Sequence, residues 1–72
     1  MEVRLFATLR EGRGKIFHID WHEGIDGAAV LAGLGIKPDE VAMFMIDGAN
    51  SKLDVKLKPN SIIAIFPPVG GG

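Results

Sequence analysis

Two segments far apart in the chain alternate between two faces, and this alternation limits the fold more than any other feature of the sequence. Residues 2–8 and 62–66 both repeat with a period of two, as a half-buried β-strand does. Each segment also places one aromatic residue, Phe6 or Phe66, on the face opposite its inward aliphatic side chains. The inward positions are Val3, Leu5, Ala7, Ile63 and Ile65. We therefore expect two strands with a shared core face and aromatic residues on the outer face.

A second strand and one helix are predicted after the first segment. The turn at residues 11–14 leads into residues 15–21, which are rich in β-branched and aromatic side chains and complete a hairpin. Asp26 is placed to cap a helix over residues 27–34, and Gly35 suits its left-handed exit. The apolar stripe of this helix consists of Val30, Leu31 and Leu34.

The next strand is predicted over residues 42–46 and is closed by a turn at residues 47–48. Both faces of this strand are apolar. Its sequence therefore leaves open whether Phe44 or the pair Met43 and Met45 points toward the core.

The predicted order is two strands, one helix and two strands, which fits an α+β fold. In a chain this short, such an order favours a mixed sheet with one helix across one face and with the first and last strands parallel at the centre. We expect one domain over residues 1–68, followed by a flexible Gly-rich tail at residues 69–72. This is the β-grasp layout of ubiquitin.

The composition excludes several classes of function. With a formal charge of −1 and scattered basic residues, the chain lacks the positive field that a phosphate backbone requires, so we expect no nucleic-acid partner. Cysteine is absent, which excludes a disulfide framework, a thiolate metal site and a cysteine nucleophile. His18 and His22 have no third ligand nearby, so no metal site is expected. Because 47% of the residues are hydrophobic, some apolar side chains should stay exposed for a partner to cover.

The sequence predicts a cytoplasmic protein without a membrane partner. Its longest apolar run, residues 62–69, is far shorter than the roughly 20 residues that cross a bilayer, and it contains Pro67 and Pro68. Residues 1–4 contain no basic region followed by an apolar stretch, so no signal peptide is expected.

Three stretches of the sequence resemble one family of proteins. They are residues 6–11 (Phe-Ala-Thr-Leu-Arg-Glu), 34–41 (Leu-Gly-Ile-Lys-Pro-Asp-Glu-Val) and, most specific, 65–72 (Ile-Phe-Pro-Pro-Val-Gly-Gly-Gly). Together with the strand order, they make nearly the whole chain similar to the ubiquitin-like sulfur carriers. This family includes the small subunit of molybdopterin synthase (MoaD) and the thiamin sulfur carrier (ThiS). The resemblance implies the same β-grasp fold for this chain.

The resemblance also implies that the chemistry occurs at Gly72. In these carriers, a ubiquitin-activating type adenylyltransferase uses ATP to adenylate the terminal carboxylate, and sulfur then displaces AMP to leave a thiocarboxylate. The chain would bind no cofactor, and would be a substrate of that enzyme and a non-catalytic partner of a larger catalytic synthase subunit. Gly70 and Gly71 have no Cβ, which suits a tail that threads a narrow channel. Pro67 and Pro68 restrict the root of this tail.

The outward aromatic residues are the second functional signal. Phe6 and Phe66 are expected on the same side of the sheet beside the tail, where exposed aromatic side chains would form a docking patch. Arg10 is a candidate to pair with an acidic residue of a partner. The expected partner-binding set is Phe6, Arg10, Phe66, Pro67, Pro68 and Val69.

Several functions stay open at this level. The proline pair favours molybdopterin biosynthesis, whereas the Gly-Gly-Gly ending also occurs in thiamin-type carriers. A protein modifier, in which Gly72 forms an isopeptide bond to target lysines, is a second class. A β-grasp interaction module with an inert tail is a third.

Overall fold

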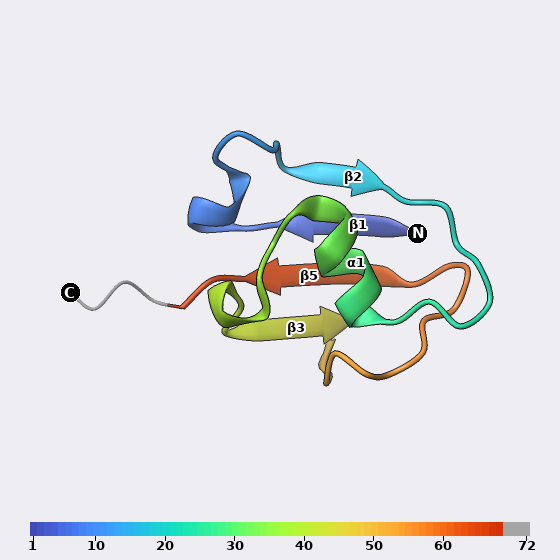
Figure 1. Ribbon diagram of the computed structural model, residues 1–72. Helices are drawn as coiled ribbons and strands as arrows, with labels where there is room; N and C mark the ends of the chain where they lie inside the picture. Colours follow the sequence, from blue (N-terminus) through green and yellow to red (C-terminus); the bar gives the residue numbers. More distant parts are fainter. Residues whose placement is uncertain (69–72) are drawn as a thin grey trace.

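Within residues 1–68, the chain folds into a mixed five-stranded sheet with one α-helix, α1 (Gly27–Leu34), across one face (Figure 1). The computed structural model describes residues 1–68. In the sheet order β2-β1-β5-β3-β4, the central strands β1 and β5 are parallel and the outer pairs are antiparallel. The strands are β1 (Glu2–Leu5), β2 (Ile16–His18), β3 (Met43–Ile46), β4 (Ala49–Asn50) and β5 (Ile62–Phe66). The predicted β-grasp arrangement is confirmed.

The core lies between α1 and the sheet, and the register of the central strands creates it. Val3 pairs with Ile63 and Leu5 pairs with Ile65, and all four side chains are fully buried. The expected core is confirmed for these residues and for the helix positions Val30 and Leu31, whereas Leu34 packs at its edge and is only partly buried. The remaining buried apolar residues are Leu9, Ile25, Ile36, Phe44 and Leu57.

The structure shows which side chains of strand β3 point toward the core. Phe44 is 4% exposed and pairs with the inward Ile65, so it belongs to the core. Met43 and Met45 pair with Phe66 and Ala64 and therefore lie on the other face of the sheet.

The first strand ends earlier than predicted, and the inward position expected for Ala7 is wrong. Ala7 has a φ of 53°, and this left-handed conformation stops the extended chain after Phe6. A short 3-10 helix, Ala7–Arg10, follows and buries Leu9 where the strand pattern had suggested a further alternation. The second strand is also shorter than residues 15–21, since only Ile16–His18 pair with β1.

Helix α1 has both predicted caps. The Oδ1 atom of Asp26 accepts a hydrogen bond from the backbone N–H of Ala29 at 3.0 Å, and Gly35 has a φ of 70°. Arg13 adds a third cap, because its guanidinium donates to the carbonyl oxygens of Leu34 at 3.3 Å and Gly35 at 3.2 Å. The hairpin turn is thereby attached to the end of the helix.

The two glycines of α1 are alike in helix propensity but differ in their surroundings. A Cβ atom on Gly27 would lie 2.8 Å from the Cζ atom of buried Phe44 and 3.1 Å from the backbone of Leu53, whereas a Cβ atom on Gly33 would meet nothing within 4 Å. We predict that Gly27→Ala lowers the free energy of unfolding by about 1–3 kcal/mol through overpacking. Gly33→Ala should raise it by up to about 1 kcal/mol. Urea denaturation of the two variants checks this, and equal effects would contradict it.

Residues 49–58 hold further structure that the sequence did not predict. The turn at Asp47 and Gly48, with φ values of 50° and 83°, leads into the two-residue strand β4. Farther along, Leu57 is buried, its N–H donates to the Ile25 carbonyl at 2.8 Å, and its own carbonyl accepts from the Trp21 indole at 2.8 Å. This segment therefore closes the core beside the start of α1.

Candidate functional site

The outer face of the sheet, opposite α1, is the candidate site. Its register brings outward side chains from four strands together, and Ile62 and Met43 are each 41% exposed. We call the following set the outer face: Glu2, Arg4, Phe6, Ile16, His18, Met43, Met45, Ile62, Ala64 and Phe66. Most of these side chains are apolar, so the face suits contact with another protein.

Phe6 and Phe66 form a stacked pair on this face. Their ring centroids are 4.2 Å apart and their planes differ by 9°, and both residues are half-buried. The pairing follows from the backbone, because the N–H of Phe6 donates to the carbonyl of Ile65 at 3.2 Å at the point where β1 leaves β5. The predicted placement of the two aromatic residues on one side is confirmed.

Arg10 extends this pair with a positive charge. The Cζ atom of its guanidinium lies 5.3 Å from the centroid of the Phe6 ring, and its Nε–H donates to the Leu5 carbonyl at 2.8 Å. A cation over an aromatic face is attracted by the ring quadrupole, typically by about 0.5–1 kcal/mol at an exposed site. Arg10 is thus held beside the aromatic pair, in a position to meet an acidic group of a partner.

A hollow of about 440 Å³ lies where β5 ends. It is lined by the two prolines that follow the strand and by five further residues, namely Ala7, Thr8, Ala42, Met43 and Phe66. Pro67 is half-buried and Pro68 is exposed. Among the described residues of this lining, Thr8 brings the one polar side chain, so the hollow suits an apolar side chain of a partner. The site residues expected at Val69, Gly70, Gly71 and Gly72, and the predicted tail itself, lie outside the described residues.

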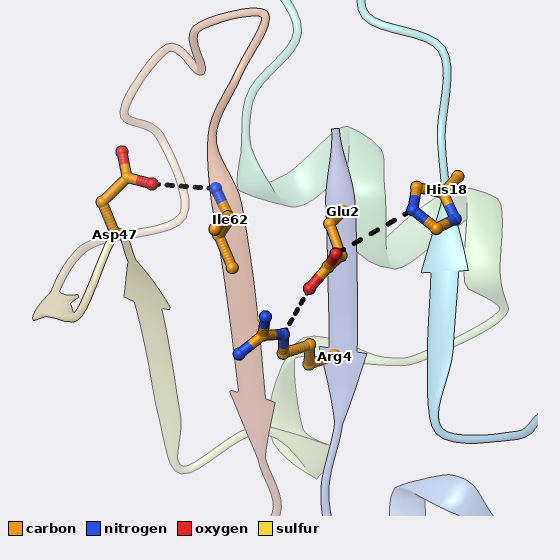
Figure 2. Close-up of polar contacts among 5 residues, drawn as sticks. All are labelled: Glu2, Arg4, His18, Asp47 and Ile62. Carbon is orange, nitrogen blue, oxygen red and sulfur yellow. Dashed lines mark hydrogen bonds and ion pairs between the residues drawn. The ribbon is translucent and has the colours of Figure 1, made fainter.

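Charged groups on the outer face are partly paired with one another. Figure 2 shows Glu2 bonded to Arg4 on its own strand and facing His18 on β2, where the His18 Nε2 and Glu2 Oε1 atoms are 3.9 Å apart. Asp47 is turned to the backbone, because its Oδ1 atom accepts from the N–H of Ile62 at 2.9 Å. Glu2 is therefore the acidic residue of the outer face, and the basic side chains of Arg4 and His18 lie next to it.

Within residues 1–68, no cluster of three or more histidine, cysteine, aspartate or glutamate side chains is placed to hold a metal ion. No helix in the same range has the length and apolar character needed to span a membrane.

The class of protein follows from this fold, which is a ubiquitin-like β-grasp. The model of the ThiS family matches residues 3–72, nearly the whole chain. The chain belongs to the ThiS family, as its resemblance to the ubiquitin-like sulfur carriers predicted. A comparison with curated proteins found no significant match.

Solved structures show the same fold. Two structures of small archaeal modifier protein 1 from Haloferax volcanii have TM-scores of 0.79 and 0.78 at 24% and 21% sequence identity. The alignments cover 99% and 94% of this chain and 97% and 95% of the modifier. A complex of subunits 1 and 2 of the molybdopterin-converting factor from Helicobacter pylori has a TM-score of 0.64 at 26% identity, over 99% of this chain and 96% of that one.

Sequence patterns did not single out Met43, Ala7 or Thr8 as part of the site. The positions of Ala7 and Thr8 depend on the left-handed turn at Ala7, which strand alternation does not predict. Met43 could be placed only once β3 was paired with β5, because both faces of its strand are apolar.

Proposed function

We propose that this chain is a sulfur carrier for molybdopterin biosynthesis. An adenylyltransferase of the ubiquitin-activating type transfers AMP from ATP to the carboxylate of Gly72 and releases pyrophosphate. Sulfur at the oxidation level of hydrosulfide then attacks the carbonyl carbon and displaces AMP, which leaves a thiocarboxylate. The chain acts as a substrate of that enzyme and afterwards as the non-catalytic subunit of a synthase, in the cytoplasm.

The stacked Phe6–Phe66 pair beside the end of β5 is the observation that carries this proposal. A partner that reacts with Gly72 must approach within the reach of residues 69–72, which is roughly 13 Å for four extended residues. Within that distance of Pro68 it meets the hollow and the aromatic pair, which are the apolar anchors that protein interfaces favour. Binding of the partner and its reaction with Gly72 would thus both take place at the end of the molecule where β5 ends.

The molybdopterin pathway is favoured over the thiamin pathway by two observations. Pro67 and Pro68 immediately precede the glycine-rich end, a feature typical of the molybdopterin branch. The Helicobacter pylori factor, which is 26% identical, forms a complex of two subunits. By analogy, the thiocarboxylate of this chain would enter a larger catalytic subunit and supply the sulfur of the dithiolene.

We predict that Phe66→Ala weakens binding to the activating enzyme or synthase by about 30-fold or more, since a truncated interface anchor costs about 2 kcal/mol or more. Phe6→Ala should act in the same direction, because it removes the ring on which Phe66 stacks. Calorimetric titration of each variant measures the affinity, and urea denaturation measures the free energy of unfolding.

Val55→Ala is the matched control for this experiment. Val55 is 44% exposed, but it lies in the segment beside α1, away from the outer face. It should leave the affinity unchanged. Unaltered binding by both phenylalanine variants, or losses in affinity no greater than their losses in stability, would contradict a docking role.

Reconstitution with each acceptor distinguishes the pathways. Conversion of a cyclic pyranopterin to the dithiolene by the larger synthase subunit and the thiocarboxylated chain would support the proposal. Sulfur transfer only to a thiazole-forming enzyme would assign the chain to thiamin biosynthesis. Adducts between Gly72 and target lysines in cells would instead indicate a protein modifier.

A further inference from the structure

Methionine is the sulfur-containing residue of this chain, since it has three methionines and no cysteine. Their environments differ. Met43 is 41% exposed, whereas Met1 packs partly buried against the core and Met45 is half-buried. Because oxidation of a thioether depends on access to the sulfur, we expect Met43, the most exposed of the three, to be oxidised fastest.

Met43 also lies where the proposed partner docks. It is paired with Phe66 across the antiparallel strands β3 and β5, at a spacing where facing side chains are in contact range. It lines the same hollow as Phe66 and the two prolines at the end of β5. A change in the polarity of this one side chain therefore acts directly on the apolar surface beside the reactive end of the chain.

We propose that Met43 is an oxidative modification site at which formation of the sulfoxide lowers the affinity for the partner; this regulation rests on the proposed function. The oxidant is a peroxide. The sulfur lone pair attacks one peroxide oxygen, an S–O bond forms while the O–O bond breaks, and hydrogen peroxide is reduced to water. A dithiol-dependent methionine sulfoxide reductase reverses the change, releasing water and forming a disulfide on the reductase.

The sulfoxide lowers the affinity for the partner because it introduces an S=O dipole. A thioether adapts its shape to an apolar partner and needs no hydrogen bond, whereas a sulfoxide oxygen is an acceptor that must lose its water when the interface closes. Leaving that acceptor without a donor should lower the affinity about tenfold or more. A bound partner should also slow the oxidation of Met43, because it covers the side chain and limits the access of peroxide to the sulfur.

The test begins with the intact chain treated with dilute hydrogen peroxide and followed by peptide mass spectrometry. Addition of one oxygen should occur on Met43 several-fold faster than on Met45 or Met1. Prior addition of the activating enzyme should slow the reaction at Met43. Equal rates at Met43 and Met45, or no protection by the enzyme, would overturn the inference.

Binding and sulfur loading are then compared before and after oxidation. Oxidation should lower the affinity of the chain for the activating enzyme about tenfold or more. Treatment with the reductase should restore this affinity. Peroxide treatment should cause no further loss of affinity in Met43→Leu, whatever the affinity of this variant before treatment, whereas the matched variant Met45→Leu should lose affinity on oxidation as the unsubstituted chain does. Full affinity of the oxidised chain would refute the regulation alone. Failure of the untreated chain to accept sulfur would refute the proposed function, and the regulation with it.

Discussion

Removal of Gly72 should abolish sulfur loading and leave the fold intact. With cognate activating enzyme, ATP and a sulfur donor, the chain ending at Gly72 should gain the mass difference of one sulfur for one oxygen, and fragmentation should place it on that residue. The deletion variant should gain nothing, because its new terminal carboxylate stops one residue short of the reacting position, and such a displacement disrupts the geometry of attack. Intact-protein mass spectrometry measures the mass gain of the intact chain and of the deletion variant.

The free energy of unfolding of the deletion variant serves as the control, because it shows whether the fold is kept. The core ends with Ile65 and the sheet with Phe66, so the free energy of unfolding should be unchanged. Gly71→Val adds a second comparison, since it keeps the length of the chain but brings a β-branched side chain into the part that enters the partner, and it should slow loading. Sulfur on the deletion variant, or no loading of the intact chain by any cognate enzyme, would mean that the carrier proposal is wrong.

The fold could be predicted where a local signal and the tertiary structure agree. Asp26 and Gly35 bound α1 as their capping chemistry predicts, and the alternation of β5 places Ile63 and Ile65 in the core. These signals act within a few residues, so the sequence displays them directly.

The remaining elements depend on contacts between distant segments. Ala7 has no side-chain preference for a positive φ, yet it adopts one in the turn that brings Leu9 into the core. Strand β4 is only two residues long, too short for an alternating pattern, and the segment containing Leu57 is held by hydrogen bonds to Ile25 and Trp21. No local periodicity encodes such an arrangement.

The site was predictable in its residues but not in its geometry. Alternation alone placed Phe6 and Phe66 on one side, yet their stacking requires the parallel register of β1 and β5. Arg10 was predicted as a charge free to meet a partner, and the structure shows it also lying over the Phe6 ring. The hollow at the end of β5 joins residues from three separate segments, so it becomes visible only in the folded chain.

Leu31→Ala should be among the most destabilising substitutions in this small core. Leu31 is 1% exposed and packs in the single cluster between α1 and the sheet, so its truncation should cost about 2–5 kcal/mol. A domain of this size has a total stability of roughly 4–11 kcal/mol, so the variant should lose a large part of it. Urea denaturation should show a lower midpoint with an unchanged slope.

Leu34→Ala is the matched comparison, because it removes the same atoms from the same helix at a position that is only partly buried. Less apolar surface is buried there and water can fill the space that is left, so the loss of unfolding free energy should be clearly smaller. The difference between the two variants therefore reports the depth of the core under α1. If Leu34→Ala cost as much as Leu31→Ala, or if Leu31→Ala cost less than about 1 kcal/mol, this packing of the helix on the sheet would be wrong.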